Sequence, residues 1–275
     1  MAITLTLIDA FASQPFSGNQ AAVAVLDQPA DEAWMQAVAS ELRLPETAFC
    51  WPEGSTYRLR WFTPTVEVDL CGHATLAAAA ALWADGHLHR EDPVAFDTRS
   101  GPLSCRRNPV GDIDLDLPLS RPTPADTPLD WARLGLATPP SEVFAGSGAG
   151  SDGFLVAVGE QASWVRQARP DLTQLERSER RPLVLTAPGD GPVHVVSRVF
   201  APTLGIDEGP VTGSAHALLA PYWMGRLGAE ELVCHQASSR GGDLRARIVE
   251  DRVMLTGRAV VMGHLMLTQA ASPLV

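Results

Sequence analysis

A run of apolar residues from Ala74 to Trp83, interrupted only by Thr75, is the most informative hydrophobic pattern in the chain. A helix that is apolar on every face is buried inside a protein. The run follows an extended segment, 61–66, and a glycine turn, so we predict a helix that begins at Gly72-His73. The first turn of such a helix presents unpaired backbone N–H groups and the positive end of the helix dipole, which together can hold an anion such as a carboxylate.

The same pattern returns about half of the 275-residue chain later. Residues 199–204 repeat 61–66, and Gly213-Ser214-Ala215 takes the place of Gly72-His73-Ala74 before a second apolar run, 215–224. An internal repeat of this kind predicts two similar halves. We expect each half to present the start of a buried helix, and a pseudo-twofold relation between the halves would bring both helix starts to one shared cleft.

Elsewhere the alternation of apolar and polar residues predicts mainly short strands, with an α+β fold of two pseudo-symmetric halves, each a β-barrel around a central buried helix. The proline-rich stretch 118–140 marks the crossover between an N-terminal half, 1–118, and a C-terminal half, 119–275, whose last strand can cross back. Helices are expected at 32–42, capped by Asp31, and at 162–169 and 172–177. Strands are expected at 3–10, 21–26, 46–51, 57–63, 94–98, 101–105, 113–117, 154–158, 182–187 and as three runs within 233–267, with turns at 146–153, 240–242 and Gly263.

Composition and charge exclude several classes of partner. The formal net charge is −11 and only 21 residues are Lys or Arg, which argues against binding to nucleic acid and against a basic membrane-binding face. No apolar stretch reaches the roughly 18 residues of a membrane span, and the N-terminus lacks the basic segment of a signal peptide. The four cysteines are scattered and without zinc spacing, so we expect a reduced, cytoplasmic protein without a metal site.

Glu46 stands out because the second half has no acid to match it. It opens the predicted strand 46–51, and the repeat places Leu183 or Val184 opposite it. A partly desolvated carboxylate beside a cleft is suited to moving protons. The plain alternative is a solvated glutamate at the start of a strand.

The predicted helix starts add polar and ionisable groups. His73 could donate to a substrate carboxylate or pass a proton, or it could be a satisfied core histidine. Cys71 precedes the first helix, where the dipole would lower the pKa of a thiol, although a small buried hydrophobe is equally compatible. Gly72 and Gly213 would let a ligand approach the backbone closely. Further polar residues near the two turns, for which capping, solvation or core packing is the ordinary role, are Asp69, Asp207, Glu208, Thr212, Ser214 and His216.

Several linked motifs, together with their spacing, resemble one family over nearly the whole chain. This is the PhzF (phenazine biosynthesis-like) family, which has the diaminopimelate epimerase-like fold. The motifs are Asp9-Ala10-Phe11, Phe16-Ser17-Gly18-Asn19, Pro45-Glu46-Thr47-Ala48-Phe49, Phe62-Thr63-Pro64, Glu67-Val68-Asp69-Leu70-Cys71-Gly72-His73-Ala74-Thr75 and Pro210-Val211-Thr212-Gly213-Ser214-Ala215.

The resemblance implies a cofactor-free isomerase, often a homodimer, with its active site between two barrel halves. In the phenazine enzyme of the family a glutamate moves a proton across a dihydro-hydroxyanthranilate ring, and the matching residue is Glu46. The family histidine after the first glycine matches His73, and its Gly-Ser at the second helix matches Gly213-Ser214. In related two-cysteine racemases the matching positions are Cys71 and Thr212, so a two-thiol mechanism is not expected here.

One position departs from the family pattern. The family commonly has an aspartate among its site residues where this chain has Gly209, and the nearby acids that could replace it are Asp207 and Glu208. The departure leaves the substrate open.

We therefore expect a cofactor-independent isomerase that moves a proton on a small carboxylic acid. Glu46 is the expected catalytic residue. Two alternatives stay open: a Cys71-dependent racemase or dehydratase of an amino or imino acid, and a non-catalytic small-molecule binding protein on the same fold. The expected substrate-binding residues are Gly72, His73, Gly213, Ser214, Cys71 and Asp207.

Overall fold

The computed structural model describes residues 3–127, 129–136, 138–147 and 153–268 of the chain. They form two compact units: Met1–Leu117 with Thr256–Val275, and Pro118–Leu255. The predicted C-terminal half, 119–275, thus gives its last segment to the first unit, because strand β18 (Ala259–Leu267) pairs with β1 (Ile3–Ala10). Among the described residues, no helix is both long and apolar enough to cross a bilayer.

The first unit is a mixed sheet. Its pairings run β18–β1–β2–β3–β4–β6–β7–β8, antiparallel except for the parallel pairs β2–β3 and β4–β6, and short β5 adds to β4. Helix α1 (Glu32–Leu42) covers one face and is capped by Asp31, whose carboxylate accepts from the Trp34 N–H at 3.1 Å. The remaining strands are β2 (Asn19–Val25), β3 (Glu46–Glu53), β4 (Thr56–Phe62), β5 (Glu67–Val68), β6 (Val94–Thr98), β7 (Gly101–Arg107) and β8 (Ile113–Pro118).

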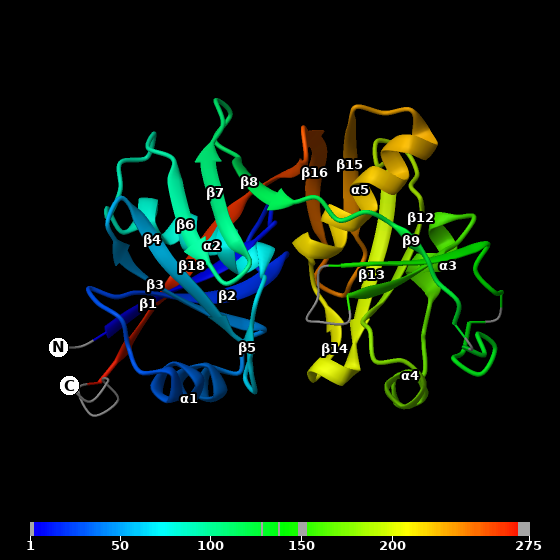
Figure 1. The fold of residues 1–275 in the computed structure, drawn as a ribbon, viewed down its shortest axis with the longest axis horizontal. Helices are drawn as coiled ribbons and strands as arrows, with labels where there is room; N and C mark the ends of the chain where they lie inside the picture. The colour runs from blue at the N-terminus through cyan, green and yellow to red at the C-terminus, as the bar shows by residue number, and fades with distance from the viewer. Residues whose placement is uncertain (1–2, 128, 137, 148–152, 269–275) are drawn as a thin grey trace. The chain divides into compact units, whose positions relative to one another are not determined.

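Helix α2 (Gly72–Ala84) is the predicted buried helix, and every residue from Gly72 to Trp83 is buried. It packs on β1, β2, β3, β7 and β18, so the strands surround it (Figure 1). Its five consecutive alanines, Ala77–Ala81, let strands approach from every side because no side chain longer than a methyl group intervenes.

The second unit repeats this topology. Its pairings β10–β11–β12–β13–β15–β16 have the same order of antiparallel and parallel contacts, with β11–β12 and β13–β15 parallel, and β14 adds to β13 as β5 adds to β4. Strand β9 pairs with β10 as β18 pairs with β1. The bounds are β9 (Thr123–Pro124), β10 (Glu142–Gly146), β11 (Phe154–Val158), α3 (Ala162–Gln167), α4 (Leu172–Ser178), β12 (Leu183–Pro188), β13 (Val195–Ala201), η1 (Pro202–Leu204), β14 (Ile206–Gly209), α5 (Gly213–Leu227), β15 (Glu231–Gln236), β16 (Gly242–Val249) and β17 (Arg252–Gly257).

Helix α5 is the counterpart of α2 and packs on β15 and β16 within its own unit (Figure 1). It begins at Gly213, as the repeat predicts, and its first eight residues are buried. Strand β10 comes very close to this helix, because a Cβ on Gly146 would lie only 2.2 Å from the side chain of Leu218. Each unit thus has an α+β core built on one internal helix.

Two details differ from the predictions. The tail forms four strands, β15 to β18, where three runs were expected. Gly263 is not a turn: it lies inside β18, at a bulge where the pairing shifts from Leu7–Gly263 to Ile8–Val261. Most of the predicted turn 146–153 lies outside the described residues.

Candidate active site

Glu46 and His73 form a buried ion pair in the first unit. Glu46 is the first residue of β3 and His73 is the second residue of α2, and their Oε2 and Nε2 atoms are 3.0 Å apart. Both atoms are shielded from solvent, and apart from this contact neither has a partner among the described residues. The Glu46 side chain keeps 12% exposure and that of His73 only 5%. The carboxylate can therefore still be reached from outside, while the imidazole is closed in.

Cys71 extends this pair into a chain of three groups. It is the N-cap residue of α2, and its Sγ lies 3.4 Å from Nδ1 of His73, within hydrogen-bond distance for sulfur. The imidazole thus has one partner at each ring nitrogen, the Cys71 thiol at Nδ1 and the Glu46 carboxylate at Nε2. This arrangement fixes the orientation of the ring.

Burial and charge set the protonation of this cluster. Burial raises the pKa of Cys71, and the nearby His73 offsets only part of that shift, so the resting form is the neutral thiol. For His73, burial alone would lower the pKa, but the charge of the Glu46 carboxylate and the contacts of the ring with Cys71 and Glu46 outweigh it and raise the pKa above its usual value. The expected lowering of the Cys71 pKa by the helix dipole is therefore wrong, because the loss of water around the sulfur outweighs the dipole.

The donor atoms of Glu46, Cys71 and His73 all lie within 4.8 Å of one another, close enough to raise the question of a metal ion. The thiol and the carboxylate, however, face different nitrogens of the same imidazole. Each ring nitrogen binds along its own direction. An ion bound at Nδ1 would face Cys71 and not Glu46, and an ion bound at Nε2 would face Glu46 and not Cys71. The geometry fits a row of proton-exchanging groups better than a coordination sphere.

The strand register corrects the expected counterpart of Glu46. Thr47 pairs with Phe62 in the first unit, and Leu183 pairs with Phe200 in the second. Because Phe200 repeats Phe62, the position that matches Glu46 is Pro182, not Leu183 or Val184. The conclusion drawn from the sequence is unchanged, since the second unit still has no acid there.

The start of α5 carries neutral groups. Thr212 is its N-cap residue, and Ser214 is 7% exposed with a hydroxyl that has no partner among the described residues. Gln236, at the end of β15, binds the turn before the helix through three hydrogen bonds. His216 is a core residue: its ring bonds to the Thr212 carbonyl at 2.8 Å and to Ser197 Oγ at 3.2 Å, and burial lowers its pKa to about 4.

The turn acids lie outside this arrangement. Glu208 is committed to Arg198, with two contacts of 2.7 and 2.9 Å, and repeats the Arg60–Glu67 pair of the first unit. Asp207 is exposed, without a side-chain partner among the described residues, so its role in binding substrate stays a prediction. Asp69 is exposed as well.

The sequence reasoning missed Gln236. Its signal is weak but present: along β15 the buried positions are Leu232, Cys234 and Gln236, so a polar amide stands where the alternation calls for an apolar side chain. Ser197, also missed, is a buried polar residue of β13, next to the buried Arg198 in a strand whose other residues are apolar.

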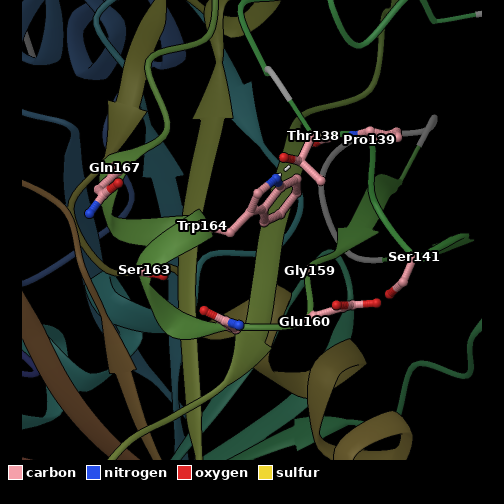
Figure 2. A pocket seen from close by; sticks show the side chains of 9 residues that line it. Thr138, Pro139, Ser141, Gly159, Glu160, Ser163, Trp164 and Gln167 are labelled. Atoms are coloured by element: carbon pink, nitrogen blue, oxygen red, sulfur yellow. Dashed lines mark hydrogen bonds between the residues drawn. The ribbon is translucent and has the colours of Figure 1, made fainter.

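A pocket of about 390 Å³ in the second unit involves none of these residues. Figure 2 shows Trp164 near the centre of the lining residues, with Ser141, Glu160 and Gln167 around it. The indole Nε1 donates to the Thr138 carbonyl at 2.9 Å and the Ser141 hydroxyl donates to that of Val158 at 3.0 Å. These polar groups are already satisfied within the protein, so the pocket is not a strong candidate for a site.

Comparison with known proteins agrees with the geometry. Residues 8–264 match the PhzC-PhzF family model, described as phenazine biosynthesis-like protein. An uncharacterized isomerase of Halalkalibacterium halodurans is 40% identical over 263 residues, which cover 95% of this chain and 97% of the relative. An uncharacterized isomerase of Pseudomonas aeruginosa is 42% identical over 266 residues, with coverage of 95% and 97%. The crystal structure of a PhzF family phenazine biosynthesis protein from Enterococcus faecalis has a TM-score of 0.87 at 39% identity, and the match covers 98% of this chain and 100% of that one.

Two repeated α+β units, each built on a buried helix, define a protein of the diaminopimelate epimerase-like fold. Within that class, the chain belongs to the PhzC-PhzF family. Relatives in two bacteria carry the name isomerase.

Proposed function

We propose that this protein is a cofactor-independent isomerase that moves a proton between two carbons of a small carboxylic acid. The observation that carries the proposal is the buried Glu46–His73 pair, with 3.0 Å between the charged atoms. In this pair the Glu46 carboxylate is partly exposed, so that a substrate can reach it. The His73 ring beside it is buried away from water. Membership of a family whose relatives are named isomerases supports the same class of reaction.

In the proposed reaction Glu46 acts first as base and then as acid. A C–H bond next to the carboxyl-bearing conjugated system breaks, its electron pair spreads into that system, and the proton forms an O–H bond on Glu46. The same carboxyl group then returns the proton to another carbon. The product is an isomer of the substrate, so the reaction needs neither oxidant nor reductant. General acid–base catalysis of this kind contributes roughly 10²–10⁴-fold to the rate.

The charge that develops on the substrate needs stabilisation, and His73 is suited to supply it. Its raised pKa favours the protonated ring, which places a cation beside the proton-moving carboxylate. We assign binding of the substrate carboxylate to the start of α2 at Gly72, next to Glu46 and His73, and Gly213 and Ser214 remain predicted binding residues. Ser214, at the start of α5, has a hydroxyl without a partner among the described residues, which is compatible with its predicted role in binding an anion.

The alternative of a thiol-dependent racemase or dehydratase has one observation in its favour, the 3.4 Å contact of Cys71 with His73. Burial works against it, because a raised thiol pKa leaves little thiolate to act as a base. In the proposed reaction the thiol instead holds the imidazole in place.

Incubation of the protein in deuterated water with a panel of small unsaturated and ring carboxylic acids tests the proposal. We expect one or more acids to gain deuterium at carbon, as read by NMR and mass spectrometry. Glu46→Gln should lower the exchange rate by roughly 10²–10⁴-fold. The matched control is Glu53→Gln, at the exposed far end of the same strand, which should leave the rate unchanged. Full exchange by Glu46→Gln would refute the assignment, and no exchange by the unaltered protein would favour a pure binding protein.

A further inference from the structure

A largely buried ion pair fastens the short strand β5 to β4. Nε and Nη2 of Arg60 donate to the two carboxylate oxygens of Glu67 at 2.7 and 2.6 Å, and the two side chains keep only 15% and 8% exposure. The backbone adds a short ladder, because β5 has two residues and pairs with β4 at Trp61–Val68 and Phe62–Glu67. A two-pronged guanidinium–carboxylate contact sets both direction and distance, so it fixes where β5 lies.

Two further charged side chains extend this pair into a network. Arg99, in the turn between β6 and β7, contacts Oε2 of Glu67 through Nη1 at 2.7 Å. Glu32, the first residue of α1, contacts Nη2 of Arg60 at 2.5 Å. The strand β5 is therefore held by side chains from two other parts of the first unit, and α1 is joined to the same network.

Strand β5 leads directly into the candidate site. Only Asp69 and Leu70 separate it from Cys71, the N-cap residue of α2. On its other side Cys71 is tied to the helix, because its carbonyl accepts from the N–H and the hydroxyl of Thr75 at 3.1 and 2.5 Å. The place of the Cys71 thiol, and with it the 3.4 Å contact to His73, is thus set by β5 from one side and by α2 from the other.

The same ion pair borders the strand that carries Glu46. The Arg60 guanidinium lies over the Phe62 ring, 5.2 Å from its centroid. Phe62 pairs with Thr47, the residue next to Glu46 on β3. The pair therefore lies beside the approach to His73 and beside the strand neighbour of Glu46.

The second unit repeats the fastening in a different setting. Arg198 on β13 and Glu208 on β14 form the matching pair, with contacts of 2.7 and 2.9 Å. There the strand leads to Thr212, a neutral N-cap residue. An Arg–Glu fastening is thus part of the scaffold, and the residues that follow the fastened strand decide whether it bears on a reaction.

We propose that Arg60 and Glu67 are positioning residues for the reaction: by fastening β5 they hold Cys71 against His73, and thereby keep the His73 ring beside the Glu46 carboxylate. Reacting groups must be held within about 0.5 Å of their productive geometry, and a small displacement lowers the rate. The inference rests on the proposed function and assigns the pair to the rate of proton transfer, not to substrate affinity.

The pKa of His73 tests the positioning without any substrate. NMR titration of histidine-labelled protein follows the imidazole rings, and the His73 signal is the one that His73→Ser removes. Glu67→Gln and Arg60→Met should both lower the pKa of His73 by about 0.5 or more, because the contacts that favour the protonated ring loosen. A change of charge alone would act in opposite directions: loss of the carboxylate would lower the pKa, and loss of the guanidinium would raise it.

The matched control breaks a similar ion pair elsewhere. Glu179 and Arg181, in the second unit, share two contacts of 2.8 Å, and their side chains are 9% and 22% exposed. Glu179→Gln should leave the pKa of His73 unchanged. Urea titration shows whether each variant is folded. Should Glu67→Gln not fold, Arg99→Gln takes its place, at a side chain that is 44% exposed, and should lower the pKa of His73 in the same direction.

Kinetics then tests the consequence for the reaction. For the acid that exchanges deuterium with the unaltered protein, Glu67→Gln and Arg60→Met should lower kcat about tenfold and change KM by less than about twofold. Glu179→Gln should change neither constant.

Three results overturn the positioning role in folded variants: shifts of the His73 pKa in opposite directions, no shift in either variant, or a higher KM at unchanged kcat. Absence of deuterium exchange by the unaltered protein overturns the proposed function instead. In that case the pKa of His73 still decides whether the pair holds the ring in place.

Discussion

The starts of α2 and α5 occupy the same place in two repeated units and differ in what they carry. At both, a side chain one turn into the helix bonds to the N-cap carbonyl: Thr75 to Cys71 at 2.5 Å, and His216 to Thr212 at 2.8 Å. At the α2 start, an ionisable imidazole pairs with a carboxylate. At the α5 start, the matching residue is Ser214, and the charge-free turn is held by an amide. The comparison teaches that one scaffold position can carry an ionisable pair in one unit and a neutral, amide-held turn in the other.

The largest effect should come from a substitution that makes the start of α2 resemble the start of α5. His73→Ser removes the cation beside Glu46, so the developing negative charge loses its stabilisation. We expect kcat for deuterium exchange to fall by roughly 10²–10³-fold. Thr75→Ser, in the same turn of α2, keeps the hydroxyl that bonds to the Cys71 carbonyl and should retain near-full activity. Equal losses in the two variants would show that the turn, and not the charge, matters.

The charge difference between the two starts should also appear in the pH dependence of stability. The pKa of His73 in the folded protein is raised above its usual value, so its stabilising effect is fully present below about pH 6.5 and is lost as the pH rises through the folded-state pKa. The free energy of unfolding of the unaltered protein, relative to that of His73→Ser, should therefore decline from pH 6 upward. Urea titrations at several pH values measure this difference, and a difference that grows with pH would contradict the protonated imidazole.

A smaller effect is expected at the N-cap of α2. Cys71→Ser keeps a group that can hydrogen-bond to His73, and it cannot act as a thiolate. If Glu46 moves the proton, exchange should fall by no more than about tenfold. A loss of about 10³-fold or more would instead support the thiol-dependent mechanism. Cys234→Ser is the control for the loss of a buried thiol elsewhere.

The smallest effect should come from placing an acid at position 209, where the family commonly has an aspartate and this chain has a glycine. In Gly209→Asp the new Cβ would lie 3.0 Å from Thr212 Oγ1, so the turn must shift slightly, at a cost of about 1 kcal/mol in the free energy of unfolding. Gly225→Asp places the same side chain where no atom lies within 4 Å and serves as the control. Thermal unfolding measures both. A Gly209→Asp variant as stable as the unaltered protein would show that the Thr212–Gln236 contact has room to adjust.

Much of the fold could be predicted from the periodicity of apolar residues. The all-apolar runs predicted both central helices, and the predicted helix 32–42 is confirmed with its Asp31 cap. The pairing of β18 with β1 could not be predicted, because the pattern of apolar residues in a strand does not indicate which other strand it pairs with. The bulge at Gly263 was misjudged for a related reason: a glycine marks a turn and a bulge alike.

Only part of the candidate site could be predicted from the sequence. Glu46 was singled out because its repeat position has no acid, and that argument survives the shift of its counterpart to Pro182. The protonation of Cys71 was predicted in the wrong direction, since burial of the thiol depends on strands far away in the sequence. Gln236 was missed because its hydrogen-bond partners lie 24 to 27 residues before it.

The amino-acid sequence by itself determined the repeat, the two buried helices and the absence of an acid at the position that matches Glu46, because these follow from local periodicity and from residue identity. Only the tertiary structure decided that Glu46, His73 and Cys71 form one row of contacts and that an amide from β15 locks the turn before α5. The physical reason is that protonation and hydrogen bonding depend on the removal of water and on the distance between groups, and both are set by strands brought together from remote parts of the chain.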